Sequence, residues 1–334
     1  MGYRIQNNTR CGVIGYGSWA TALVHTLEKN KKEIWWHIRN EEVLESMQTE
    51  GRNAKYLSDI EFNKDRVIAT SDLNEVVRNC EIILVAAPSA YLKKFLEELT
   101  EPLEGKFILS ATKGIVPDEL ITITEYFNRA YNLPYSNIGV ISGPSHAEEV
   151  ADNKLSYLTV ACKAEENAKL IGEMFATNNV KISYSEDIYG IEYAGILKNI
   201  YALASGLANG LGYGDNFRAV LAAASAKELR RFIDESYPFE RDTMDAAYLG
   251  DLLVTSYSSF SRNRRLGKLI GHGCTVKSAL NEMTMIAEGY FAANCIKHIN
   301  EKHNIYMPIA EMVYDVLYRR MSPRKRMKEL TALL

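Results

Sequence analysis

Short apolar runs alternate with amphipathic stretches along the first half of the chain. Runs of about five or six residues rich in β-branched and aromatic side chains are typical of buried strands. Between several of them, apolar residues recur at helical spacing. The apolar runs predict strands at residues 10–15, 33–38, 66–70, 81–87, 106–112 and 138–142, and the amphipathic stretches predict helices at 18–30, 40–50, 72–79 and 89–100.

This order of elements predicts a sheet with helices on both of its faces. A strand, a helix and another strand in series form a right-handed crossover, and a succession of such units gives a parallel sheet. Residues 155–162 and 180–185 add two more predicted strands, on either side of a helical stretch at 167–176. We therefore expect a doubly wound α/β domain in the first part of the chain.

The pattern changes after about residue 186, where strand-like runs disappear. The remainder is predicted to be helical, with glycine-rich breaks such as GLGYGD at 210–215. A chain of 334 residues is also too long for one ordinary core. We expect a nucleotide-binding domain over residues 1–187 and an all-helical domain over residues 188–334.

The composition is that of a folded protein, with 47% hydrophobic and 24% charged residues. A formal net charge of −3 argues against a nucleic-acid-binding protein, but a local basic pocket could still bind a small anion. The five cysteines are scattered and include no C-x-x-C pair, so we expect no disulfide framework, no metal site and a reducing cytoplasm. Residues 1–10 contain no apolar run and are not expected to be a secretory signal.

The sequence GYGSWA at 15–20 follows the first predicted strand and begins the first predicted helix. Gly15 would allow a tight turn, Gly17 would let the backbone approach a pyrophosphate, and Ala20 would allow close helix packing. A plain glycine turn is the alternative, but this context favours a Rossmann-type dinucleotide site. The predicted contacts of NAD or NADP in this turn are Gly15, Gly17, Ser18 and Trp19.

The second predicted strand ends beside Arg39. Folds that are specific for NAD usually carry an acid here for the ribose hydroxyls, whereas an arginine can accommodate a 2′-phosphate. An exposed arginine at a strand end would be an equally simple explanation. Arg39 tips the prediction towards NADP, while Glu41 and Glu42 close by keep NAD open.

Lys198 is the only charged residue between Glu192 and Asp215, in a stretch rich in alanine, leucine and glycine. A central lysine costs a membrane-spanning helix about 2.5–3.5 kcal/mol, so we expect no membrane span but a buried helix. An ammonium group there is poorly solvated, and its pKa should fall towards the range useful for acid–base catalysis. The alternative is a lysine that extends its amine to the protein surface.

Three further stretches lie at predicted strand ends or in the helical region. ATKG at 111–114 and SGPSHAEEV at 142–150 follow the fifth and sixth predicted strands, and LGDLLVTSYSSFSRNRR lies at 249–265. Ligands of open α/β sheets bind outside the carboxyl ends of the strands. We therefore expect these stretches to contribute to one cleft.

Six motifs in order resemble those of bacterial NAD(P)-dependent sn-glycerol-3-phosphate dehydrogenases, over about residues 10–320. They are GYGSWATAL, ATKG, SGPSHAEEV, LKNIYALASGLANGLGYGDN, GDLLVTSYSSFSRNRRLG and AEGY. The resemblance implies reversible hydride transfer between NAD(P)H and dihydroxyacetone phosphate, which gives sn-glycerol 3-phosphate for glycerophospholipid synthesis. It also implies that the protein is a cytoplasmic homodimer. The small phosphorylated substrate is its expected binding partner.

By this resemblance, Lys198 is the general acid/base, Lys113 contacts substrate and cofactor, and Asp251 belongs to the substrate site and holds Lys198. A solvated loop lysine and a turn residue are the simpler explanations of Lys113 and Asp251. The resemblance assigns further substrate contacts to Gly143, Ser145, Ser261, Arg262 and Asn263, and cofactor contacts to Lys113, Ala147, Arg262, Ile286 and Glu288.

Two alternatives remain open on the sequence. Another two-domain reductase of small ketoacids, of the ketopantoate reductase or 3-hydroxyacid dehydrogenase type, would share the glycine turn and a lysine between domains but should lack the SRNRR and GPS combination. A non-catalytic nucleotide-binding regulator would be expected to have a degraded cleft, whereas Lys113, Lys198 and Asp251 are all present. His146 and Tyr257 depart from the family pattern, and the sequence assigns them no role.

Overall fold

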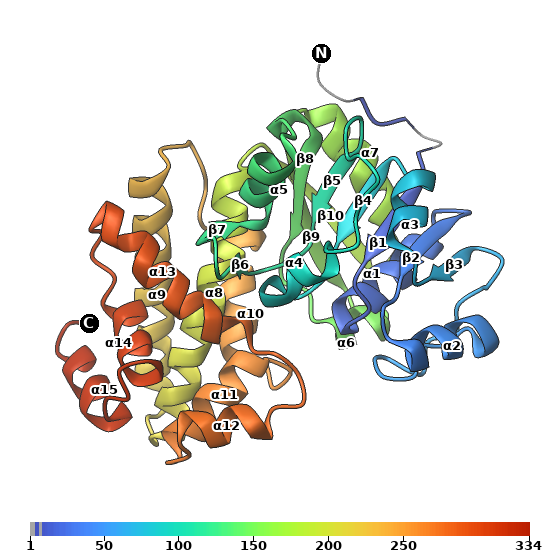
Figure 1. The fold of residues 1–334 in the computed structure, drawn as a ribbon. Coiled ribbons are helices and arrows are strands. Elements are labelled where there is room, and N and C mark those ends of the chain that lie inside the picture. Colours follow the sequence, from blue (N-terminus) through green and yellow to red (C-terminus); the bar gives the residue numbers. More distant parts are fainter. Residues whose placement is uncertain (1–3, 7–8) are drawn as a thin grey trace. The chain divides into compact units, whose positions relative to one another are not determined.

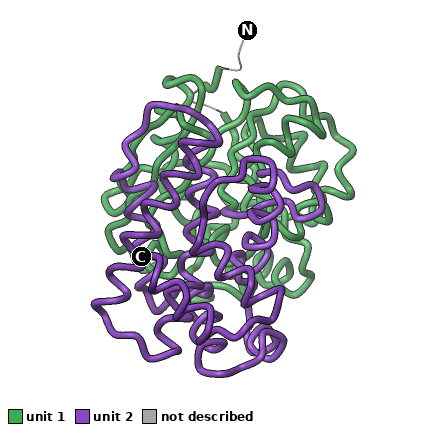
Figure 2. The backbone as a smooth tube through the Cα atoms, turned by 90° about the vertical axis from the view of Figure 1, so that its left-hand side faces the viewer, with its two compact units in different colours: residues 1–112, 123–188 green, residues 113–122, 189–334 purple. Residues whose placement is uncertain are grey.

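The computed structural model describes residues 4–6 and 9–334. The segment 1–10, for which the sequence predicts no secretory signal, therefore lies partly outside the described residues. The chain forms two compact units, coloured separately in Figure 2. Unit 1 comprises residues 1–112 and 123–188, and unit 2 comprises residues 113–122 and 189–334.

Within the described residues, the sheet of unit 1 has eight strands in the order β10-β9-β8-β5-β4-β1-β2-β3 (Figure 1). The order reverses beside β1, since the chain runs outwards from β1 to β3 and then returns to β4 on the other side. This is the doubly wound arrangement that the alternating pattern predicts, and the α/β fold class is confirmed. The strands are β1 Cys11–Ile14, β2 Ile34–His37, β3 Val67–Thr70, β4 Ile82–Val85, β5 Phe107–Ser110, β8 Ile138–Ser142, β9 Ser156–Cys162 and β10 Val180–Ser185.

Helices cover both faces of this sheet. Adjacent strand residues point to opposite faces, so they pack against different helices. Val13 belongs to the apolar core that includes residues of α1 and α7. A Cβ on neighbouring Gly12 would instead meet Val76 of α3 and Cys80, which follows that helix. The helices of unit 1 are α1 Ser18–Glu28, α2 Glu41–Glu50, α3 Leu73–Asn79, α4 Leu92–Phe95, α5 Ile123–Tyr131, α6 Ala147–Ala151 and α7 Glu165–Phe175.

The sheet departs from the predicted parallel arrangement at β9, which pairs antiparallel with β8. The other pairs in the sheet are parallel. A parallel pair needs a connection that returns to the starting end of the strand, usually along a helix. The only helix between β8 and β9 is α6, whose five residues span about 7.5 Å, less than half the length of β8.

The helix predicted over 89–100 is wrong beyond Phe95. A 3₁₀ turn at Ser89–Tyr91 is followed by the single turn of α4, and the helix ends there. The side chain of Asn74 binds the remainder, because its Oδ1 accepts from the backbone N–H groups of Thr100 and Glu101 and its Nδ2 donates to the Glu98 carbonyl. These bonds replace the hydrogen bonds that a continued helix would make.

Unit 2 is helical apart from a short antiparallel hairpin, which no sequence pattern predicted. Among the described residues, no helix is both long and apolar enough to cross a membrane. The elements are the hairpin strands β6 Ile115–Val116 and β7 Ile121–Thr122, and the helices α8 Ile188–Gly210, α9 Asp215–Ser236, α10 Asp251–Tyr257, α11 Arg262–Gly271, α12 Val276–Glu282, α13 Glu288–His303, α14 Pro308–Leu317 and α15 Pro323–Thr331.

Helices α8 and α11 pack with their backbones in contact (Figure 1). A Cβ on Gly206 of α8 would lie 2.1 Å from the carbonyl oxygen of Arg264, and one on Gly267 of α11 would lie 2.2 Å from that of Leu203. Both positions lack space because the neighbouring atoms belong to rigid backbone. Glycine at these positions therefore determines how closely the two helices approach.

We predict that Gly206→Ala destabilises the protein, because the added methyl group must push α11 away from α8. The expected loss is about 1–3 kcal/mol in the free energy of unfolding, measured by thermal or urea denaturation. The matched control is Gly214→Ala, since a Cβ at Gly214 would meet no atom within 4 Å. Equal destabilisation by the two substitutions would contradict this account of the helix packing.

Candidate active site

The most deeply buried ionic group of unit 2 is a carboxylate between two ammonium groups. Asp251, at the start of α10, is 1% exposed, and Lys198, in the middle of α8, is 6% exposed. Oδ1 of Asp251 accepts a hydrogen bond from Lys198, and Oδ2 accepts one of 2.9 Å from Nζ of Lys113. The predicted general acid/base and the two groups predicted beside it therefore lie together. Lys198 does not extend to the surface.

This arrangement shifts the acid–base properties of its members. Burial lowers the pKa of Lys198 from its usual value to about 7; Asp251 opposes this decrease, and the positive charge of Lys113 adds to it. Burial acts to raise the pKa of Asp251, but Lys113 and Lys198 outweigh it and hold that pKa below its usual value. Lys198 can consequently exchange a proton near neutral pH while Asp251 stays ionised.

Lys113 lies at the start of the 113–122 hairpin, and a chain of amide hydrogen bonds connects its backbone to α8, α11 and α13. Nδ2 of Asn199 donates to the carbonyl of Lys113 at 3.0 Å. Nδ2 of Asn263 donates to Oδ1 of Asn199, and Oδ1 of Asn263 accepts from the N–H of Gly289, both at 2.9 Å. The side chain of Asn199 therefore connects Asn263, a predicted substrate contact, to the backbone of Lys113.

Asn199 is a site residue that the sequence analysis missed. Its position directly after Lys198, as a buried amide in an apolar helix, was the available signal. Buried amides need hydrogen-bond partners, and Asn199 finds them in Lys113 and Asn263.

The other predicted contacts of unit 2 lie at the beginnings of α11 and α13. Ser261 is buried and caps α11 by accepting a hydrogen bond from the N–H of Arg264. Arg262 is the first residue of α11 and is exposed. Glu288 is the first residue of α13, and Ile286 lies just before it and is half-buried.

The glycine turn of unit 1 has the geometry expected of a dinucleotide site. Gly15 has a φ of +114°, and its carbonyl accepts a 2.6 Å hydrogen bond from Nε1 of Trp36 in β2. Gly17 precedes α1, and a Cβ there would meet no atom within 4 Å, so its backbone is open to a ligand. The turn follows β1 at the point where the strand order reverses. Space, backbone and helix N-terminus thus fit a pyrophosphate.

The side chains after this turn support its position. Ser18 begins α1 and is buried, and Ala20 is fully buried in the core. Nε1 of Trp19 donates to the carbonyl of Ala111 at 3.2 Å, which ties the first turn of α1 to the end of β5.

Arg39 lies just beyond β2 and is held in place. Its Nη1 donates to the carbonyl of Lys94 at 2.7 Å, and its guanidinium carbon lies 5.4 Å from the centre of the Phe95 ring. Glu42, the acid that could favour NAD, forms an ion pair with Lys55 at 2.6 Å.

The segment after β8 carries the remaining predicted contacts of unit 1. Gly143 has a φ of +128°, and its carbonyl accepts a hydrogen bond of 3.0 Å from Oγ of Ser145. Ala147 is buried at the start of α6, and His146 precedes it. The predicted residues thus form two groups, one in each unit, with Gly143, Ser145 and Ala147 in unit 1.

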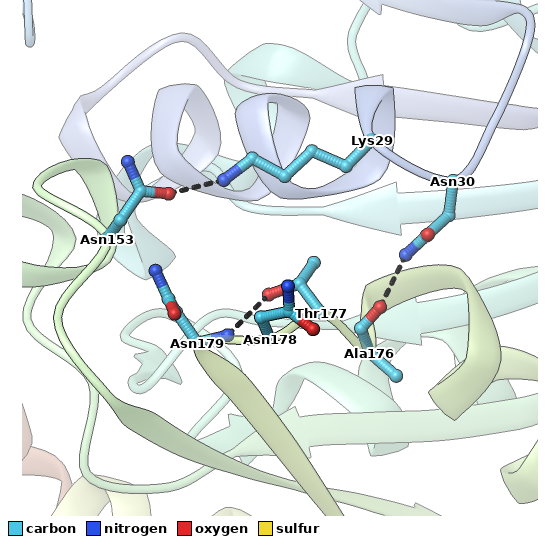
Figure 3. Close-up of a pocket in the computed structure, with 7 residues that line it drawn as sticks. All are labelled: Lys29, Asn30, Asn153, Ala176, Thr177, Asn178 and Asn179. Atoms are coloured by element: carbon cyan, nitrogen blue, oxygen red, sulfur yellow. Dashed lines mark hydrogen bonds between the residues drawn. The ribbon is translucent and has the colours of Figure 1, made fainter.

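Figure 3 shows a polar pocket of unit 1 that none of the predicted site residues lines. Lys29 and Asn30, just after the end of α1, contribute to it, with Nζ of Lys29 donating to Oδ1 of Asn153. The glycine turn lies at the beginning of α1, so this pocket is at the opposite end of the helix from the proposed pyrophosphate position.

The whole chain is similar to known dehydrogenases. Residues 10–168 match the N-terminal part, and residues 187–328 the C-terminal part, of NAD-dependent glycerol-3-phosphate dehydrogenase. The chain is 36% identical over 327 residues to glycerol-3-phosphate dehydrogenase (NAD(P)+) 2 of Salinibacter ruber, covering 97% of this chain and 94% of that protein. The chain belongs to the NAD-dependent glycerol-3-phosphate dehydrogenase family.

Two further proteins similar to this chain support the assignment to the glycerol-3-phosphate dehydrogenase family. Glycerol-3-phosphate dehydrogenase (NAD(P)+) of Staphylococcus haemolyticus is 33% identical, over 96% of this chain and 97% of its own. The crystal structure of glycerol-3-phosphate dehydrogenase from Coxiella burnetii has a TM-score of 0.89 at 28% identity, covering 98% of this chain and 99% of that one. Membership in this family favours the dehydrogenase over the ketoacid reductase and the non-catalytic regulator.

We predict that Asp251→Asn destabilises this dehydrogenase-family protein by about 3–5 kcal/mol, because it leaves two ammonium groups without their buried carboxylate. Without Asp251 the pKa of Lys198 should fall further, so that the folded protein releases a proton that the unfolded chain retains. Stability then rises with pH, and the deficit relative to wild type should be larger at about pH 6 than at about pH 8.

Urea denaturation at the two pH values measures this difference. Asp215→Asn is the matched control, because the Asp215 side chain is 90% exposed and its ion pair with Arg218 contributes little. A deficit that did not depend on pH would show that the carboxylate does not control the protonation of Lys198.

Proposed function

We propose that the protein is an NAD(P)-dependent sn-glycerol-3-phosphate dehydrogenase, which interconverts dihydroxyacetone phosphate and sn-glycerol 3-phosphate. Family membership over almost the whole chain supports the reaction. The observation that carries the chemistry is the buried cluster of Lys198, Asp251 and Lys113, because it contains a lysine that can change protonation near neutral pH.

The cofactor is NAD or NADP, and when bound it supplies or accepts the hydride. The backbone of Gly15 and Gly17 would hold its pyrophosphate at the N-terminus of α1, with Ser18 and Trp19 beside it. Further cofactor contacts are proposed for Lys113, Ala147, Arg262, Ile286 and Glu288.

Lys198 is the proposed general acid/base. In the direction of reduction its ammonium group donates a proton to the C2 carbonyl oxygen of dihydroxyacetone phosphate. In the direction of oxidation the neutral amine accepts the proton of the C2 hydroxyl group. A pKa near neutrality keeps both forms of the side chain accessible at working pH.

Asp251 positions Lys198 through their hydrogen bond, and its negative charge limits how far burial lowers the lysine pKa. Lys113 brings a second positive charge to the same carboxylate and would stabilise negative charge that develops on the reacting oxygen. The proposed substrate contacts, besides these three residues, are Gly143, Ser145, Ser261, Arg262 and Asn263. Arg262 is suited to the phosphate, since its guanidinium can donate two parallel hydrogen bonds.

The finer parts of the proposal concern the setting of the reaction. Residues 1–187 would serve as the dinucleotide domain and 188–334 as the catalytic domain. The product would supply glycerophospholipid synthesis in the cytoplasm, and the active form would be a homodimer. Family resemblance supports these points.

Lys198→Ala is expected to lower the rate of dihydroxyacetone phosphate reduction at least about 100-fold, because proton transfer to the carbonyl oxygen loses its donor. The loss of NAD(P)H absorbance measures the rate, and quenching of protein fluorescence checks that NAD(P)H still binds. Lys227→Ala is the matched control, since Lys227 is an exposed lysine of α9. Equal turnover by the two variants would show that Lys198 is not the general acid/base. Absence of turnover by the wild type with either cofactor would show that dihydroxyacetone phosphate is not the substrate.

NADP is the proposed preference, on the basis of Arg39. Arg39→Ala should raise KM for NADPH about tenfold and leave KM for NADH nearly unchanged, because only NADPH carries the 2′-phosphate that the guanidinium would bind. Arg66→Ala, an exposed arginine just before β3, is the control. An unchanged ratio of the two KM values would show that Arg39 is a structural residue at the strand end.

A further inference from the structure

Unit 2 contains a cavity of about 600 Å³ that no residue of the proposed active site lines. Helices α11 to α14 and the beginning of α15 contribute to it. Its apolar lining includes three buried residues, Ile270, Val316 and Leu317. Leu280 and Tyr290 also line it. Its size and its mainly apolar wall are typical of a small-molecule site, for which volumes of about 300–1,000 Å³ are usual.

The charged groups of the wall are both positive. Lys277 and Arg320 line the cavity, and no aspartate or glutamate does. In the described part of the chain, neither side chain forms an ion pair with a carboxylate. Two cations beside apolar side chains, without a counter-charge from the protein, create a local preference for an anion.

The backbone at Arg320 is an independent sign of constraint. Its φ of +56° lies in the left-handed region, which is sterically unfavourable for a residue with a Cβ. A hydrogen bond of 3.0 Å from the N–H of Met321 to the carbonyl of Asp315 closes the turn around it. This turn follows the end of α14 and fixes the backbone from which the Arg320 side chain reaches the cavity wall.

We propose that this cavity binds an amphipathic anion, a molecule with an unbranched apolar chain and a phosphate or carboxylate headgroup. The chain would lie against Ile270, Leu280 and Leu317. The headgroup would bind Lys277 and Arg320. This site is distinct from the proposed active site, and its occupation does not depend on the proposed reaction.

Cys274 provides a direct readout, because it lines the cavity and, within the described residues, is the only cysteine that is not buried. Burial raises the pKa of the other four thiols, Cys11, Cys80, Cys162 and Cys295, which lowers their reactivity. A maleimide should therefore label the folded chain at Cys274, and Cys274→Ser should remove the label.

The test measures the rate of maleimide labelling of the full chain with decyl phosphate, decanoate, decanol or decyltrimethylammonium. The ionic compounds are used below their micelle concentrations and decanol below its solubility limit. We expect saturable protection by decyl phosphate, by decanoate or by both, and little protection by the alcohol or the cation. The two anions distinguish the headgroups. No turnover is required, so failure of the proposed dehydrogenase reaction would leave this result interpretable.

Variants test the two parts of the site separately. Lys277→Gln and Arg320→Asn should each weaken protection by the anion about tenfold, since each removes one charge-assisted contact. Asparagine is chosen at Arg320 because it tolerates the left-handed backbone. Leu280→Trp should block protection by filling the space for the chain, and the exposed Lys302→Gln is the matched control. Circular dichroism and thermal unfolding confirm that each variant is folded.

Three results would overturn the proposal. Equal protection by decanol would show a purely apolar cavity with no anion preference. Equal protection by the cationic compound would show a detergent effect on the whole protein. Protection by the anions that was unchanged in both Lys277→Gln and Arg320→Asn would place the anion elsewhere.

Discussion

A single buried carboxylate between two ammonium groups is the interaction on which unit 2 depends. Asp251 accepts from Lys198 and Lys113, which come from α8 and from the 113–122 hairpin, so one side chain joins three separate segments. Neither lysine could be buried cheaply without it. Burial and the positive charge of Lys113 lower the pKa of Lys198, and Asp251 limits the decrease.

Close backbone packing around α8 fixes the second layer of the site. Gly206 and Gly267 let α8 and α11 approach until only glycine fits, and a Cβ on Gly289 of α13 would lie 2.6 Å from the carbonyl oxygen of Asn199. At these separations a short amide side chain is long enough to bridge two helices. Asn263 does so, with Asn199 on one side and the N–H of Gly289 on the other. The positions of the lysines and of α11 and α13 are therefore coupled through glycines that carry no chemistry of their own.

Local pattern was sufficient for most of the fold and for singling out Lys198, whereas Lys113 and Asp251 were predicted only from the family resemblance. Hydrophobic runs located the eight strands of the unit 1 sheet, and the turn around Gly15 and Gly17 lies where the strand order reverses. What the pattern missed depends on contacts between distant segments. The segment after Phe95 has helical periodicity, but its backbone groups form hydrogen bonds with the Asn74 side chain instead of with one another. The direction of β9 follows from the shortness of α6. The position of Asn199 beside Lys198 could have been noticed in the sequence, but its hydrogen-bond partner Asn263 could not.

The helices of the cavity and of the site are partly the same. α11 begins with Arg262 and Asn263 and contributes Ile270 to the cavity near its end, and α13 begins with Glu288 and contributes Tyr290. A ligand in the cavity would therefore contact two of the helices that carry the proposed site contacts. Such a ligand can alter the site only by the difference in its affinity for two arrangements of these helices. The glycine contacts leave α8 and α11 no room to approach further, and a separation of the two helices would lengthen the hydrogen bond between Asn263 and Asn199.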